Sequence, residues 1–128
     1  PAERVLFSGD AVWLDQHPYM AQANSRDWLH GLAFIKKLNP VTIVPGHGPP
    51  CGVEAVDRVT EYIRYMRAQV KHMFRQGKSK QETGSLLVKD LVTWFPIPAG
   101  RKAKIESQIK QGIGRVYEEI RRTAVTDS

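Results

Sequence analysis

The sequence predicts an α/β fold in which a strand–helix–strand unit is followed by a mostly helical region. Apolar, β-branched runs at residues 4–8 and 41–45 flank a segment with helical periodicity, as in parallel strands joined by a helix. From residue 53 onward, apolar side chains recur every three or four positions, the spacing of helices that bury one face. We therefore expect residues 1–52 to form the strand–helix–strand part and residues 53–128 to form a helical region that packs on it.

Two short strands are predicted in the first half of the chain. Residues 4–8 and 41–44 are rich in apolar and β-branched side chains, which favour a strand. The first strand leads into Ser8-Gly9-Asp10, and the second leads into Pro45-Gly46-His47-Gly48. Functional residues commonly lie where strands of a sheet end and the chain enters a loop. These two motifs are therefore the first places to look for a site.

A helix is predicted between the strands, after a loop at residues 11–24. Asn24 or Ser25 can cap it, because short polar side chains accept hydrogen bonds from the free amides of a first turn. Pro40 ends the helix after Leu38. The predicted apolar side of this helix consists of Trp28, Leu32, Ile35 and Leu38.

Three more helices are predicted in the second half. The first runs from about residue 53 to Gly77, and the second opens with the capping-box spacing of Ser79 and Glu82 and continues through Leu91. Residues 94–98 form an apolar connector, which we expect to be packed. A last helix follows over about residues 101–123, and we expect residues 124–128 to fray. The two longer helices carry the apolar stripes Val56, Val59, Ile63, Met66, Val70 and Met73, and Ile105, Ile109, Ile113, Val116 and Ile120.

Composition narrows the classes of function. The chain has 128 residues with 41% hydrophobic and 25% charged side chains, as in a soluble globular protein, and no apolar run approaches the roughly 18 residues of a membrane span. One cysteine, Cys51, excludes an intrachain disulfide, and we expect a small buried thiol. The net charge of +6 arises in residues 53–128. Because this region has no arginine-rich or aromatic-interleaved cluster, the favoured explanation of its positive charge is a solvated helix surface. The composition does not indicate the cellular compartment.

Asp10 and His47 are the candidate metal ligands. A carboxylate and an imidazole at neighbouring strand ends can converge on one ion, and both suit zinc, iron or manganese. Gly46 and Gly48 permit a tight loop and leave little bulk around the imidazole. Each motif alone is more often an ordinary turn, and two ligands are fewer than the roughly three of a catalytic zinc. The two motifs together therefore predict part of a metal site.

With these motifs in this order, the sequence resembles the metallo-β-lactamase-fold hydrolase superfamily. The matching stretches are residues 5–10 and 42–49, and the resemblance covers about residues 4–50. Residues 9–13 and His17-Pro18-Tyr19 are similar to the subgroup near glyoxalase II and the zinc hydrolases associated with quinoprotein systems. The resemblance implies the C-terminal part of an αββα sandwich with a predominantly helical C-terminal extension.

The resemblance also implies roles for individual residues. Asp10 would bridge two divalent metal ions, and so take part in catalysis, while His47 would bind the second ion. The expected ions are Zn²⁺, with iron or manganese as alternatives. His17 and Tyr19 lie in the loop that borders the substrate pocket, where substrate binding competes with simple packing of the loop, and we favour packing.

One departure from the superfamily matters for function. Its His-x-His-x-Asp-His signature and a further metal-binding histidine precede the Gly-Asp turn, and neither occurs among the chain's four histidines, His17, His30, His47 and His72. We expect His30 and His72 at the surface. Because the sequence also begins at Pro1, directly before a strand, we expect a C-terminal fragment of a dinuclear hydrolase that is inactive without its N-terminal half.

Partners and alternatives follow from the same features. The intact enzyme would attack an ester, thioester, lactone or related bond in a small-molecule substrate, and the metal set does not choose among these. Uncovered sheet edges favour a homo-oligomer, or a requirement for the N-terminal half. Neither membrane nor nucleic acid is an expected partner. The alternatives are a basic helical module that binds nucleic acid or protein without catalysis, and a degenerate relative that has lost the metal.

Overall fold

The computed structural model describes residues 5–13, 17, 18, 20, 24–38, 40, 42–47 and 51–127, and at residues 5, 7, 9–13, 46, 47 and 125–127 it describes the backbone alone. The elements follow in the order β1, α1, β2, α2, α3 and α4. Their bounds are Val5–Trp13, Ser25–Lys37, Thr42–His47, Val53–Arg75, Lys80–Leu91 and Lys102–Asp127. The predicted sequence of a strand–helix–strand unit and then helices is confirmed.

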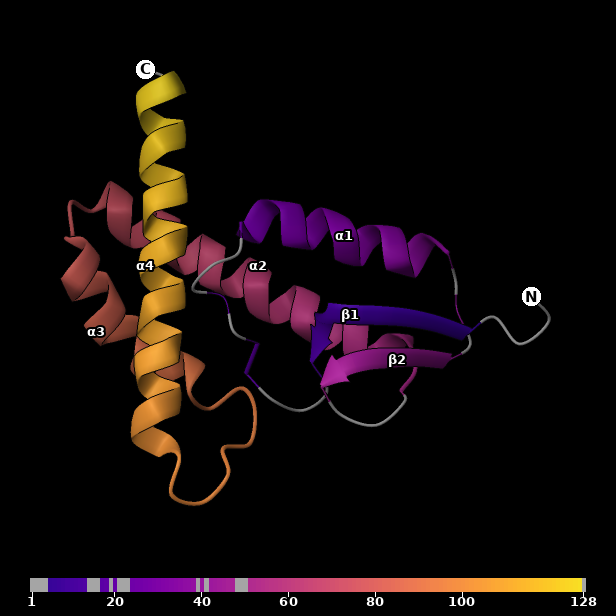
Figure 1. Cartoon of the computed structure of the whole chain (residues 1–128). Coiled ribbons are helices and arrows are strands. Elements are labelled where there is room, and N and C mark those ends of the chain that lie inside the picture. Colours follow the sequence, from indigo (N-terminus) through magenta and orange to yellow (C-terminus); the bar gives the residue numbers. More distant parts are fainter. Residues whose placement is uncertain are drawn as a thin grey trace.

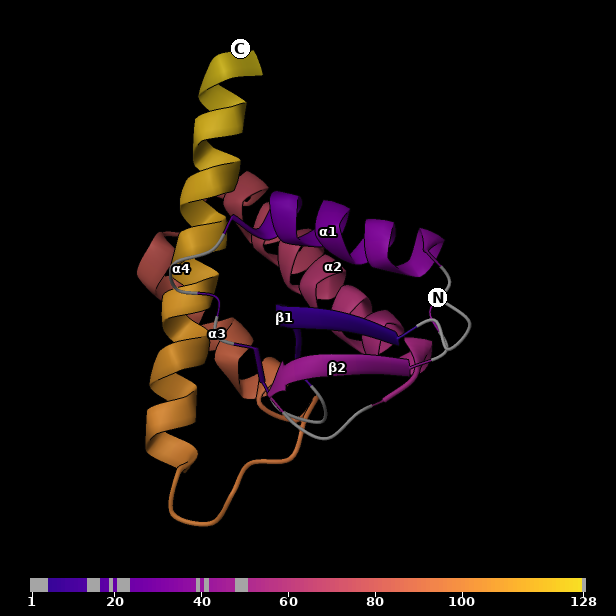
Figure 2. The ribbon, with the colours of Figure 1, turned by 45° about the vertical axis from the view of Figure 1, so that its right-hand side comes forward.

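The two strands form a parallel pair connected through α1. Parallel neighbours need a long crossover, and α1 provides it. Figures 1 and 2 show α1 and α2 running along the strands, while α3 and α4 lie beyond the ends toward which the strands point. The described residues form one two-stranded sheet, so they do not show the αββα sandwich that the resemblance implies.

The hydrophobic core is centred on α2, which contacts α1, α3 and α4. The predicted stripe of this helix is buried from Val56 to Val70, and Met73 packs at its margin. The packed connector is also confirmed, because Phe95 is buried and Trp94 packs against the core. Among the described residues, the core hydrophobic ones with at most 2% exposure are Met20, Leu32, Ile43, Val56, Val59, Tyr62, Ile63, Met66, Val70, Leu87, Leu91, Ile113 and Val116. None of the described helices is long and apolar enough to cross a membrane.

The helix ends agree closely with the sequence prediction. The Asn24 side chain caps α1 by accepting a hydrogen bond from the Asp27 amide at 3.0 Å. Ser79 and Glu82 form the reciprocal capping box of α3. Gly77 follows α2 with a φ of +83°, a conformation that favours glycine because it has no Cβ.

Three boundaries differ from the prediction. β1 continues to Trp13 and β2 to His47, because the strands remain paired beyond Ser8 and Val44. The last helix runs to Asp127 instead of fraying from residue 124, since those positions carry no proline or glycine to stop it. Leu38 is 50% exposed, because it follows the last turn of α1 and has left the buried side of the helix.

Candidate functional site

The backbones of Asp10 and His47 lie on neighbouring parallel strands. Asp10 follows Gly9, which pairs with Pro45, and His47 is the last residue of β2 and pairs with Trp13. The prediction that both would follow the ends of their strands was wrong for Asp10, which lies inside the longer β1. The side chains of Asp10 and His47 lie outside the part of the chain that the structure describes.

The pairing between the strands is irregular around these two positions. From Gly9 to Trp13 the register of β1 advances by four residues while that of β2 advances by two, from Pro45 to His47. Pro45 contributes to this irregularity, because proline has no amide hydrogen to donate to its neighbour. Such bulges bend a strand and redirect its side chains, and they are frequent beside active sites. Asp10 therefore lies on a distorted segment next to the end of β2.

The chain returns to β2 shortly after His47. Cys51 and Ile43 exchange two backbone hydrogen bonds, of 2.7 and 2.8 Å, as an isolated antiparallel bridge. The Ser8 hydroxyl also donates to the Val44 carbonyl at 3.4 Å, which links the strands just before the irregular segment. His47 therefore lies between two positions at which the chain is hydrogen-bonded, Val44 before it and Cys51 after it. Cys51 itself is partly exposed, although we expected a buried thiol.

His17 is packed into the core between α2 and the connector. Its ring is 7% exposed. Nδ1 lies 3.3 Å from the Tyr62 hydroxyl, and Nε2 lies 3.3 Å from the Val92 carbonyl oxygen. Because that carbonyl can only accept, Nε2 carries the proton and Nδ1 accepts from Tyr62. Edge-on contacts with Tyr62 and Phe95, at 5.5 and 5.3 Å between ring centres, complete the packing that we favoured for this residue.

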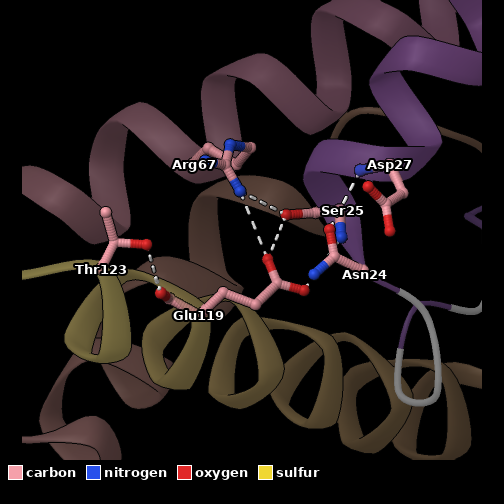
Figure 3. A network of polar contacts seen from close by, with 6 residues as sticks. All are labelled: Asn24, Ser25, Asp27, Arg67, Glu119 and Thr123. Atoms are coloured by element: carbon pink, nitrogen blue, oxygen red, sulfur yellow. Dashed lines mark hydrogen bonds and ion pairs between the residues drawn. The ribbon is translucent and has the colours of Figure 1, made fainter. Parts of the chain in front are cut away.

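A polar network that sequence reasoning missed ties α1, α2 and α4 together (Figure 3). The fully buried Ser25 donates its amide to Glu119 Oε1 at 2.9 Å and its hydroxyl to Glu119 Oε2 at 2.5 Å. Arg67 donates from Nη1 to the Ser25 hydroxyl at 2.7 Å, and lies 3.3 Å from Glu119 Oε2. The sequence offered one hint, since Ser25 was a candidate cap, but its partners lie 42 and 94 residues away.

The sequence of the chain is similar to that of a known protein. Over 97 residues, the chain is 34% identical to the "Beta-lactamase-like protein 2 homolog" of Caenorhabditis elegans. The match includes 70% of this chain but spans only 30% of that relative. No protein-family model matches the chain. The similarity to the beta-lactamase-like protein supports the predicted metallo-β-lactamase-like relationship, and with it a possible hydrolase family, while the glyoxalase II-like subgroup stays a prediction.

Asp10 and His47, the metal ligands predicted from the sequence, are the positions to test for a metal. Their donor atoms, a carboxylate oxygen and an imidazole nitrogen, fit a divalent ion, and their strands are neighbours. Among side chains that the structure describes, no group of three histidine, cysteine or acidic residues could hold an ion. Tyr19, the other candidate for substrate binding, lies outside the described residues, and His30 and His72 are exposed as expected.

The burial of His17 predicts that the protein loses stability in mild acid. Burial lowers the pKa of this imidazole from its ordinary value of 6.5, against the opposing effect of the Val92 and Phe95 backbones. The unfolded chain therefore binds a proton near pH 6.5 while the folded chain does not. The full contribution of neutral His17 is present above pH 6.5, and it is lost as the pH falls below that value, with a slope of at most about 1.4 kcal/mol per pH unit.

Urea unfolding at pH 7.5, 6.5 and 5.5 measures this effect. His17→Gln should flatten the dependence of the unfolding free energy on pH, whereas His30→Gln, at an exposed position of α1, should leave it unchanged. An equally steep dependence in the His17 variant would show that other groups are responsible.

Proposed function

We propose that this chain is the C-terminal part of a dinuclear metal-dependent hydrolase of the metallo-β-lactamase type. The observation that carries the proposal is the position of Asp10 and His47 on adjacent parallel strands, beside an irregular stretch of pairing. Its support is twofold. The two motifs match the superfamily in type and order, and the chain is similar to a beta-lactamase-like protein.

In this proposal Asp10 would be shared between two ions, and His47 would hold one of them. The anionic carboxylate offers two oxygens and can therefore serve two cations at once, while the imidazole binds as a neutral ligand. A bound divalent ion polarises a carbonyl or phosphoryl oxygen and lowers the pKa of its water. Gly46, immediately before His47, adds no side chain beside the ligand, which leaves room for an ion. Zinc is the proposed metal, with iron or manganese as alternatives.

The remaining ligands are proposed to come from an N-terminal half of the same domain. The chain's four histidines do not form the His-x-His-x-Asp-His signature, and the chain spans only 30% of its beta-lactamase-like relative. Without that half, two ligands cannot complete a catalytic site, so the chain alone is proposed to be inactive. The substrate class remains an ester, thioester, lactone or related bond in a small molecule. The comparison does not favour the alternative of a basic, non-catalytic helical module.

The test begins with the coding sequence upstream of Pro1. We expect it to encode the His-x-His-x-Asp-His signature, and we expect the complete protein to hold two divalent ions per chain by elemental analysis. Hydrolysis of a thioester, a lactone and a carboxylic ester is then compared among variants. Asp10→Asn and His47→Gln should each lose bound metal and at least about 100-fold in activity, because even indirect supports of metal ligands commonly contribute 10- to 100-fold.

His72→Gln is the matched control, since His72 lies exposed on α2. It should keep both metal and activity. An upstream sequence without the signature, or full metal content in the Asp10 and His47 variants, would refute the proposal.

A further inference from the structure

A basic cleft lies between the C-terminal part of α2 and the last turns of α4. Its volume is about 440 Å³, within the range of pockets that hold small ligands. Three cations line its α2 side, Arg67, Lys71 and Arg75. They are four residues apart along the helix, so they project from one face. None of the described residues that line the cleft is acidic.

Two of these cations are available to a ligand. Within the described part of the chain, Lys71 and Arg75 make no hydrogen bond or ion pair, and both are exposed. Arg67 is held in place by Ser25 and Glu119, and both of those bonds use Nη1. Like charges four residues apart on a helix repel one another, and neither Lys71 nor Arg75 has an acidic partner among the described residues that would offset this repulsion. An anion in the cleft would relieve that repulsion.

The rest of the lining is mostly apolar. It consists of Ala68 and Phe74 from α2 and of Ile120, Thr123 and Ala124 from α4. The Phe74 ring is already fixed, because it makes an edge contact with Tyr117 at 5.5 Å between ring centres. Tyr117 is in turn anchored by donating its hydroxyl to the Lys78 carbonyl at 2.9 Å. A ligand can therefore bury an apolar group here without first ordering the aromatic ring.

We propose that this cleft binds a small organic anion that carries a carboxylate or phosphate head and an alkyl tail. The head lies near Lys71 and Arg75, and the tail packs against Phe74 and Ile120. This binding site is separate from Asp10 and His47, and it does not depend on the proposed hydrolase function. Because the cleft offers both free cations and apolar residues, it should bind such a ligand more tightly than a simple inorganic anion.

Calorimetric titration of the 128-residue chain with alkyl phosphates tests the proposal. Octyl phosphate below its micellar concentration should bind more tightly than hexyl phosphate, by about twofold to fourfold for each added methylene. Inorganic phosphate should bind much more weakly than either. Octyltrimethylammonium, which has the same tail and the opposite charge, should not bind. Added salt should weaken the binding of octyl phosphate.

Variants locate the site. The double variant Lys71→Gln, Arg75→Gln should lower the affinity for octyl phosphate about tenfold, because each exposed charge contributes modestly. The double variant Lys89→Gln, Lys104→Gln removes the same charge from exposed positions of α3 and α4 outside the cleft, and it should bind as the parent does. Ala68→Trp, at an exposed position on the cleft margin, should block the tail, and circular dichroism confirms that each variant is folded.

Three results would overturn the proposal. The first is an affinity that does not depend on tail length, and the second is an equal loss of affinity in both charge variants. The third is displacement of octyl phosphate by a short oligonucleotide that binds more tightly through the same two cations, which would identify a polyanion site instead.

Discussion

Replacing Phe95 with alanine is expected to lower the free energy of unfolding by about 3 kcal/mol. The ring is 4% exposed, although it lies in an irregular connector between α3 and α4. It makes edge contacts with His17 and Tyr62, and the Arg58 guanidinium lies 5.2 Å from its centre. Its removal would leave a cavity between His17 and two side chains of α2, Arg58 and Tyr62.

Phe34→Ala is the matched control, because it deletes the same atoms from a ring that is 61% exposed. That variant should change the unfolding free energy by no more than about 0.5 kcal/mol. Urea unfolding followed by circular dichroism measures both, and an unchanged dependence on urea concentration would show that the denatured states are comparable. A Phe95 variant as stable as the Phe34 variant would mean that the connector rearranges and fills the space.

Replacing Glu119 with glutamine is expected to cost about 2 kcal/mol of stability. The variant keeps the size of the side chain but removes the negative charge that faces Arg67 and the first amide of α1. The side chains of Glu119 and Arg67 are only 13% and 27% exposed, so water cannot fully replace the lost partner. The amino end of a helix also favours an anion, and the substitution removes that interaction.

Glu118→Gln provides the comparison on the adjacent residue of the same helix. Glu118 pairs with Arg121 and Lys80 at the surface, where water screens both ion pairs. We expect little change in stability for this variant, and none in high salt, while the loss in Glu119→Gln should persist in high salt. Thermal unfolding at low and high salt separates the two. Equal losses in both variants would show that the buried network contributes no more than a surface ion pair.

The helical half could be predicted closely from the sequence because its signals are local. The apolar stripe of α2, the capping box of α3 and the positive φ of Gly77 each depend on residues within a few turns of one another. The strand boundaries were less accurate. Strand length depends on the partner strand, and the pairing continues through two register shifts that no local pattern indicates.

The candidate site likewise has features that could be predicted from the sequence and features that could not. The two motifs could be placed on neighbouring strands from the sequence, and the parallel register confirms that placement of the backbone. The buried contacts of His17 were not predictable, because Tyr62 and Val92 lie 45 and 75 residues further along the chain. The network of Ser25 and Glu119 was missed for the same reason, since polar residues at such separations carry no shared periodicity.

The bond between Ser25 and Glu119 joins residues that are 94 positions apart. During synthesis, α1 therefore emerges long before the carboxylate that will meet its first amide. Contacts of such long range are made late, because the intervening chain must first be ordered. A nascent chain that is not yet complete through α4 would hold α1 without this hydrogen bond, and incompletely packed segments of this kind are prone to misassembly.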